Sequence, residues 1–228
     1  YAPIGVFAMI AYTVGSYGIA MLIPLGKLIL SVAGATALFI CVVALIASLF
    51  TGINFFHVIR ALKDILFLAF STASSEAALP GAMKRLEELG VPKTIVTFVM
   101  PTGYSFNLDG STLYSSAGIL FIAQLYGIQM PIEQQLLVMV TLMLSTKGIA
   151  GVPGAGIIVV AATAAAFNLP TEGVAILLGI DRLLDMIRTI CNVCGNCMAT
   201  VVVACWEKEL NKATFNEKYR AFLGGKNR

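Results

Sequence analysis

The sequence predicts an all-α membrane protein built as an inverted repeat of two re-entrant helical hairpins. Each hairpin is followed by a broken or polar transmembrane helix, and two transmembrane helices precede the first hairpin. Of the 228 residues, 58% are hydrophobic and 12% are charged, with a mean hydropathy of +0.89. Two long apolar stretches are broken at their centres by polar or glycine-rich segments, and basic residues gather in two places. Soluble domains carry more charge, so a bilayer is the expected environment.

Residues 1–54 are expected to form two transmembrane helices, since roughly 20 apolar residues cross the hydrocarbon core. The stretch up to Leu25 carries no charge. It has no initiating Met, and no basic segment followed by a small-residue cleavage site. We therefore expect it to lie inside a membrane domain, with further helices upstream.

The first hairpin is predicted at about residues 57–90. Polar residues that weaken a helix lie at its centre, followed by a proline: Ser71, Thr72, Ser74, Ser75, Glu76 and Pro80. Irregular backbone at membrane depth is tolerated where it lines a cavity or is buried in protein, so two arms meeting at a polar tip are expected. Basic residues flank both ends, which the positive-inside rule assigns to the cytoplasm.

A broken transmembrane helix is predicted at about residues 92–126. The expected breaks are at Pro101–Ser105 and again at Asn107–Ser111. Unwound carbonyls beside a carboxylate are hard oxygen ligands that suit a small cation, which makes Asp109 a candidate ion ligand. The alternative is that Asp109 only caps the broken helix.

The second hairpin is predicted at about residues 131–169, because four glycines and a proline fall within nine residues at 148–156. Its flanks, Glu133 and Glu172, are acidic, so this hairpin is expected to open outside. The last helix, at about 173–206, then returns to a basic cytoplasmic tail at 209–228. Such paired broken hairpins indicate an inverted-repeat secondary transporter. A helical bundle with small-residue packing is the alternative.

The last helix carries one polar stripe. Its members are Asp181, Asp185, Arg188, Asn192 and Asn196. At about 100° per residue these positions fall within an arc of roughly 80°. A charged side chain at the bilayer centre costs at least ~2.5 kcal/mol, so the stripe indicates a binding site or a pathway. A purely structural Asp185–Arg188 ion pair is the alternative.

Three other classes of protein agree less well with the sequence: an ion channel, a membrane redox protein and an enzyme. Re-entrant loops also build ion channels, but a channel would not need an adjacent acid and base to hold a zwitterion. Cys191, Cys194 and Cys197 invite a redox cluster, yet no fourth cysteine followed by proline completes that pattern. An enzyme is not expected, since His57 is the single histidine and suggests no catalytic set. No cofactor, structural metal or nucleic acid is expected.

Four motifs together resemble the dicarboxylate/amino acid:cation symporter family, in the family's order and across nearly the whole chain. They are STASSEAALP at 71–80, PTGYSFNLDGS at 101–111, GVPGAG at 151–156, and GIDRLLDMIRT with the following N-V-x-G-N at 179–196. The resemblance is to the C-terminal half of bacterial proton/glutamate-aspartate symporters. It implies that residues 1–54 end a scaffold and begin a transport domain, whose core is 55–208.

The resemblance also implies roles for single residues. Arg188 would pair with the substrate's side-chain carboxylate through two parallel hydrogen bonds, and Asp185 would hold its amino group. Further substrate contacts would come from the last helix, the broken helix and the two hairpin tips: Thr189, Asn192, Ser111, Ser75, Val152 and Gly156.

Three cation sites are implied in the same way. Gly103, Asn107, Asn192 and Asn196 match the first site, Ser105 and the backbone from Thr146 to Ile149 match the second, and Asp109 with Asn107 matches part of the third. The family forms homotrimers in the cell membrane, so the bilayer, coupling cations and an acidic amino acid are the implied partners.

Departures from the family pattern favour protons over sodium as the coupling ion. Asn196 replaces an aspartate, which removes a charged cation ligand, and Lys147 adds positive charge near the second site. Glu76 supplies a titratable carboxyl and is the candidate proton carrier. Ala73 and Met186 fill the two positions where relatives place a second arginine. Asp185 favours glutamate or aspartate over a C4-dicarboxylate, which has no ammonium group to pair with it.

Overall fold

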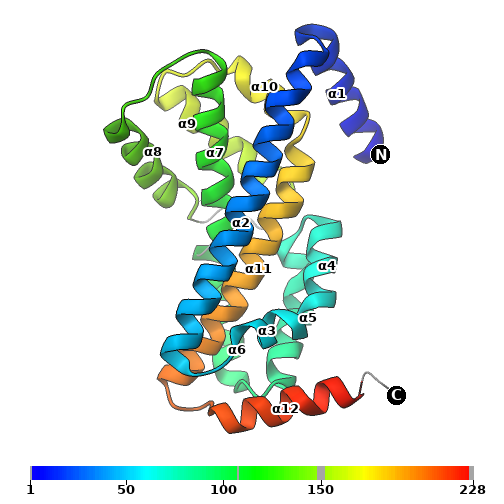
Figure 1. The fold of residues 1–228 in the computed structure, drawn as a ribbon, viewed down its shortest axis with the longest axis vertical. Coiled ribbons are helices and arrows are strands. Elements are labelled where there is room, and N and C mark those ends of the chain that lie inside the picture. The colour runs from blue at the N-terminus through cyan, green and yellow to red at the C-terminus, as the bar shows by residue number, and fades with distance from the viewer. Residues whose placement is uncertain (1, 107, 148–151, 226–228) are drawn as a thin grey trace.

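A computed structural model describes residues 2–106, 108–147 and 152–225, and within these ranges the chain forms helices and connecting turns without any strand (Figure 1). The all-α prediction is therefore confirmed for the described part of the chain. Two of the described helices are long and apolar enough to cross a membrane, at Ile19–Thr51 and Asp181–Trp206.

The first of these spans includes α2 (Leu22–Thr51), which follows α1 (Ala2–Tyr17) and a single 3-10 turn, η1 (Ile19–Met21). Helix α2 ends at Gly52, whose φ of 71° lies in the left-handed region that glycine adopts without strain. Large apolar side chains face outward along α2, with Leu49 77% and Phe50 82% exposed. Such a surface suits lipid or another protein segment better than water.

The predicted first hairpin corresponds to α3 (Phe55–Ala61), α4 (Lys63–Thr72) and α5 (Ser75–Glu88). The chain reverses at Ala73, whose φ is 52°, and Ser74 then caps α5 by accepting a hydrogen bond from the Ala77 N–H. Pro80, expected to interrupt this segment, instead lies within α5. We call α4, α5 and the turn between them the first hairpin.

The predicted broken helix corresponds to α6 (Lys93–Phe106) and α7 (Asp109–Leu125). The expected break at Pro101–Ser105 is wrong, since α6 continues through these residues. Two hydroxyls within this segment bond back to its own carbonyls: Thr102 Oγ1 donates to the Phe98 carbonyl at 2.7 Å and Ser105 Oγ to the Pro101 carbonyl at 3.3 Å. Helix α6 ends just before Asn107, which lies outside the described residues.

Helices α8 (Ile132–Ser145) and α9 (Ala155–Ala166) form what we call the second hairpin. Residues 148–151 of the glycine-rich tip lie outside the described residues. The short helix α10 (Glu172–Leu178) precedes α11 (Asp181–Trp206), so the last long helix begins several residues later than the predicted 173. The polar stripe therefore starts at the first residue of α11.

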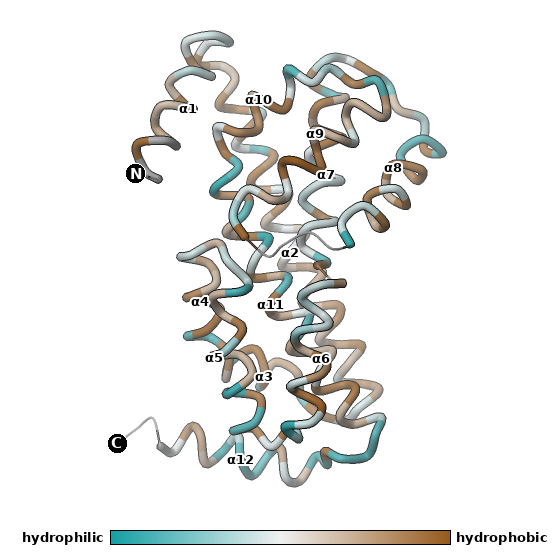
Figure 2. The backbone as a smooth tube through the Cα atoms, turned by 180° about the vertical axis from the view of Figure 1, so that it is seen from behind, coloured by the Kyte–Doolittle hydropathy of each residue, from teal (hydrophilic) through white to brown (hydrophobic). Residues whose placement is uncertain are grey.

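The tail contains one more helix, α12 (Lys212–Gly225), which packs against the base of the first hairpin. The Tyr219 ring stacks on His57 with centroids 4.3 Å apart, and Arg85 lies 4.4 Å above the Phe222 ring. Figure 2 shows hydrophilic residues along α12 and in the chain leading to it. The predicted cytoplasmic tail is thus a helix docked on the protein.

Two apolar cores lie at opposite ends of the molecule. One is built from α3–α6, α12 and the C-terminal halves of α2 and α11, and the other from α7–α10 and the N-terminal halves of α2 and α11. Helices α2 and α11 run side by side along the long axis and link the two (Figure 1). The described parts of both hairpin tips contact the N-terminal third of α11, where the polar stripe begins.

Candidate functional site

The polar stripe of α11 is buried along its whole length. Asp185, Arg188, Asn192 and Asn196 are each at most 1% exposed, and Asp181 is 8% exposed. Charges and amides are not buried at such density without partners, because each unpaired group costs free energy. The partners come from α7 and from both hairpins.

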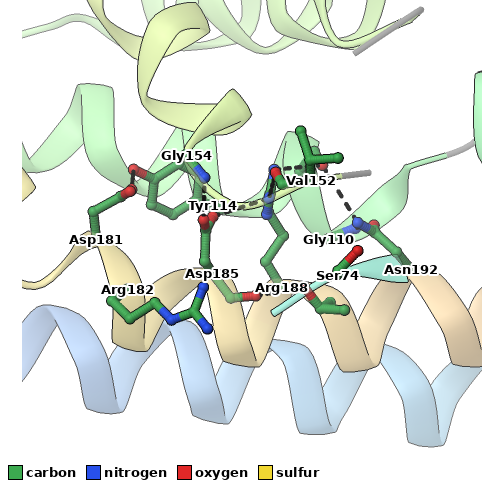
Figure 3. A network of polar contacts seen from close by, with 12 residues as sticks. Ser74, Gly110, Tyr114, Val152, Gly154, Asp181, Arg182, Asp185, Arg188 and Asn192 are labelled. Carbon is green, nitrogen blue, oxygen red and sulfur yellow. Dashed lines mark hydrogen bonds and ion pairs between the residues drawn. The ribbon is translucent and has the colours of Figure 1, made fainter. Parts of the chain in front are cut away.

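Asp185 and Arg188 form an ion pair, with 3.0 Å between Asp185 Oδ1 and Arg188 Nη2. Both side chains also bind the tip of the second hairpin (Figure 3). The Gly154 N–H donates to Asp185 Oδ2 at 2.6 Å, and Arg188 Nη2 donates to the Val152 carbonyl at 3.2 Å. One acid and one base of α11 thus hold the described part of this tip, Val152 and Gly154, against the helix.

The start of α7 closes the other side of the site. Ser111 Oγ accepts hydrogen bonds from Arg188 Nη1 at 3.3 Å and from Asn192 Nδ2 at 3.4 Å. The Gly110 N–H donates to Asn192 Oδ1 at 2.9 Å. A Cβ on Gly110 would meet the Arg188 carbonyl and lie 2.8 Å from Cys191 Cβ, so only glycine permits this approach. The first turn of α7 is therefore fitted directly onto the stripe.

Gly156 and Thr189 also lie beside this charged pair. A Cβ on Gly156 would lie 3.1 Å from Arg188 Nη1, which places the start of α9 against the guanidinium. Thr189 is buried, and its hydroxyl donates to the Asp185 carbonyl at 2.7 Å. The Thr189 hydroxyl thus donates its hydrogen bond within α11. Gly156 has no side chain and can contact a ligand only through its backbone.

The first hairpin contributes Ser75, which is 1% exposed. Its hydroxyl has no hydrogen-bond partner within the residues that the structure describes. A buried hydroxyl without a partner is costly, and a bound ligand could satisfy it. Glu76, the next residue, is exposed and does not join the buried cluster.

The residues matched to cation sites are only partly brought together. A Cβ on Gly103 would lie 2.9 Å from Asn196 Cγ, and one on Gly195 would lie 2.8 Å from Asp109 Oδ2, so α6, α7 and α11 meet here. Thr146 is buried, and its hydroxyl lies 2.8 Å from that of Thr112. Ser105 and Lys147 are exposed. Asn107 falls outside the described residues.

Tyr114 and Arg182 belong to this network but were not found by sequence reasoning. The Tyr114 hydroxyl donates to Asp181 Oδ1 at 2.6 Å (Figure 3). Arg182 Nη2 donates to the Thr72 carbonyl at 3.0 Å. Neither residue lies on the stripe, and a single tyrosine in an apolar helix carries no special signal. Arg182, as a further charge near the stripe, could have been singled out.

We expect Tyr114→Phe to lower the free energy of unfolding by about 1–3 kcal/mol, because Asp181 loses a buried hydrogen bond. Thermal melting of the purified full-length protein measures this. Tyr17→Phe is the matched control, since Tyr17 is 41% exposed and its loss of a hydroxyl should change stability by less than about 0.5 kcal/mol. Equal melting temperatures for the two variants would contradict the assigned bond.

The three cysteines of the C-x2-C-x2-C run are buried free thiols on α11. Among the described residues, no group of three or more His, Cys, Asp or Glu side chains is arranged to hold a metal ion. Val193, Cys194 and Cys197 pack within the apolar core at the α12 end of the molecule. Their observed surroundings are those of small core residues.

The described residues thus form an all-helical protein with a buried cluster of opposite charges between two hairpin tips, which is a candidate binding site. The chain belongs to the sodium:dicarboxylate symporter family, whose sequence model matches residues 1–206. The resemblance drawn from the four motifs is confirmed.

Three relatives give the range of similarity. The chain is 53% identical to a proton/sodium-glutamate symport protein of Geobacillus stearothermophilus over 213 residues, which are 93% of this chain and 50% of that protein. It is 49% identical to the proton/glutamate-aspartate symporter of Escherichia coli K12 over 224 residues, 98% of this chain and 51% of that one. A C4-dicarboxylate transport protein of Burkholderia pseudomallei strain 668 is 44% identical over 225 residues, 98% of this chain and 52% of the relative. The chain thus spans about half the length of the curated relatives it matches.

Proposed function

We propose that the full-length protein is a secondary active transporter that carries L-glutamate or L-aspartate across the cell membrane together with protons. The observation that carries this proposal is the buried pair Asp185 and Arg188, one acid and one base that share the tip of the second hairpin. An acidic amino acid offers an ammonium group to the first and a side-chain carboxylate to the second. Family membership and the names of the relatives support the same function.

In the proposed mechanism the ligand exchanges partners with the residues of the site. Its side-chain carboxylate replaces Asp185 at the Arg188 guanidinium, whose planar fork can form two parallel hydrogen bonds. Its ammonium group pairs with the Asp185 carboxylate. Neutral polar contacts come from Ser111, Asn192 and Ser75. The tip of the second hairpin must then release Val152 and Gly154 from α11 while the ligand enters. We assign this tip the role of the extracellular gate.

The membrane arrangement belongs to the same proposal. Both hairpins are re-entrant, the first from the cytoplasm and the second from outside, and α12 lies on the cytoplasmic side. The basic residues of α12 and of the first hairpin's base support this orientation, since they lie at one end of the molecule (Figure 1). Alternating access moves the core at 55–208 within a homotrimer, in the inner or plasma membrane of the cell.

A C4-dicarboxylate is the second candidate substrate, favoured by the similarity to the Burkholderia pseudomallei relative. A dianion such as succinate would use Arg188 but would face the Asp185 carboxylate without an ammonium group. That buried repulsion favours the amino acid.

Uptake into liposomes under separate ion gradients tests the coupling ion. With full-length protein, radiolabelled aspartate should accumulate under a proton gradient without sodium, because Asn196 offers an amide where a carboxylate would strengthen a sodium site. Glu76 is exposed but directly follows Ser75 at the tip of the first hairpin, so Glu76→Gln should lose proton-driven uptake; Glu133→Gln should keep it, since Glu133 is an exposed carboxylate in the first turn of α8, at the end of that helix away from the tip. Uptake that requires a sodium gradient and ignores the proton gradient would refute proton coupling.

A further inference from the structure

The first turn of α11 holds three separate parts of the molecule through three different side chains. Asp181 binds Tyr114 of α7, Arg182 binds the Thr72 carbonyl of the first hairpin, and Asp185 binds the Gly154 N–H of the second. These three contacts arise within five consecutive residues. The proposed roles of Asp185 and Arg188 explain the contacts to the second hairpin. They give no role to Arg182.

We propose that Arg182 is a positioning residue that fixes the tip of the first hairpin on α11, so that Ser75 faces the substrate. This inference rests on the proposed function, because it takes α11 to be the helix that binds the substrate. In it, one turn of α11 sets the distance between the two hairpin tips. Arg182 and Asp185 are three residues apart and therefore neighbours on the helix surface. The two tips are accordingly held at adjacent points.

The contact to Thr72 is suited to a fixed tip. Thr72 is the last residue of α4, and Ala73 leaves the helix with a φ of 52°. Carbonyls in the last turn of a helix lack intrahelical partners and carry partial negative charge, so a guanidinium is a favourable donor there. The Thr72 hydroxyl is already used within α4, where it donates to the Leu68 carbonyl at 2.8 Å. Arg182 reaches the carbonyl from α11.

The position of Ser75 follows from the same turn. The Ser74 N–H donates to Thr72 Oγ1 at 3.3 Å, and Ser74 Oγ accepts from the Ala77 N–H at 3.3 Å. Thr72, Ser74 and the first turn of α5 are therefore linked by hydrogen bonds as one unit, with Ser75 at its centre. A contact that fixes Thr72 therefore also fixes the position of Ser75. The buried Ser75 hydroxyl has no hydrogen-bond partner among the described residues.

Arg182 also completes the local charge balance. It lies close enough to Asp181 and Asp185 to interact electrostatically with both, as Arg188 does. Two acids and two bases thus share this end of α11. When Asp185 turns to a ligand ammonium group and Arg188 to a carboxylate, the remaining Asp181 and Arg182 still balance each other. The first hairpin can then stay in place while the second opens.

Three substitutions of Arg182 in the full-length transporter test the assignment. Arg182→Met removes both charge and donor, and should raise KM for aspartate uptake about 10-fold with Vmax within about twofold, since one charge-assisted hydrogen bond is lost. Arg182→Lys keeps a charged donor and should restore KM to within about threefold of the original. Arg182→Gln keeps a donor without charge and should lie between the two. Arg220→Met, at an exposed arginine of α12, is the control and should leave KM unchanged.

Amide hydrogen exchange without substrate provides a readout that does not depend on transport. In Arg182→Met, peptides that cover residues 70–80 should exchange faster, while peptides from α9 should not change. Unchanged exchange at 70–80 or an unchanged KM would overturn the proposal, as would faster exchange throughout the protein or a loss of Vmax at constant KM. If Asp185→Asn were to leave aspartate uptake intact, the proposed substrate site would fail, but the exchange result would still decide the role of Arg182.

Discussion

Asp185→Asn is expected to weaken aspartate binding by about 30-fold or more, while succinate binds as well as before or better. Asp185 is fully buried, and its carboxylate is the proposed partner of the ligand's ammonium group. Removing one member of a desolvated charge pair costs about 2–5 kcal/mol, and each 1.4 kcal/mol is about a factor of ten. Succinate has no ammonium group, so it loses nothing and escapes a buried repulsion.

Binding of both ligands to the full-length protein should be measured by isothermal titration or by protection against thermal unfolding. Glu172→Gln is the control, since it removes an exposed carboxylate at the start of α10 and should change neither affinity. Aspartate affinity that survives Asp185→Asn, or an equal loss for both ligands, would remove Asp185 from the role proposed for it.

Gly110→Ala should have the largest effect on folding. The added methyl group would collide with the Arg188 carbonyl and with Cys191 Cβ, both of which belong to the rigid interior of α11. Backbone cannot move aside as the end of a flexible side chain can. Helices α7 and α11 would have to separate, at a cost of more than about 3 kcal/mol, and the bond from Gly110 to Asn192 would be lost.

The yield of monodisperse full-length protein and its melting temperature measure this effect. Gly34→Ala is the matched control, because a Cβ at Gly34 of α2 meets no atom within 4 Å in the described structure. Alanine is the better helix former by about 1 kcal/mol, so this variant should fold as well as the original or better. A Gly110→Ala protein that melted at the original temperature would show that α7 and α11 are not in such close contact.

The stripe on α11 could be predicted because helical periodicity depends on sequence spacing alone. Polar side chains at offsets of 4, 7, 11 and 15 residues from Asp181 share one face of a regular helix. The charged ones are costly in a membrane, so their presence indicates a function. Both hairpin tips were predicted from residues that disfavour a helix, since glycine or small polar residues replace apolar ones there. Helix propensity and burial act locally at these places, so local sequence sufficed.

The breaks in α6 were less predictable. Proline and glycine at 101–103 indicated an interruption, but α6 continues through them and packs against α11, where a Cβ on Gly103 would lie 2.9 Å from Asn196 Cγ. Packing against a distant helix overrode local propensity here. The late start of α11 at Asp181 and the folding of the tail into α12 depended in the same way on contacts between distant segments.

Arg182 and Tyr114 mark the limit of pattern reasoning within the site. Their partners, Thr72 and Asp181, lie 110 and 67 residues away in the sequence. No period or motif connects such positions, and only the packing of α4, α7 and α11 brings them together. Family resemblance implies roles for single positions in the sequence. These contacts instead join two distant residues, so they follow only from the folded structure.

The division of the interior into two cores also bears on how the protein is made. Each core combines early segments with late ones, since Ala44 and Val96 share a core with Val201 and Phe215, and Leu25 and Leu28 share the other with Leu177 and Leu184. Synthesis proceeds from the N-terminus, so neither core can close until α11 has left the ribosome. Until then the packing surfaces of both hairpins stay uncovered, and a nascent chain that stopped before Asp181 would present two unfinished interiors to quality-control proteases.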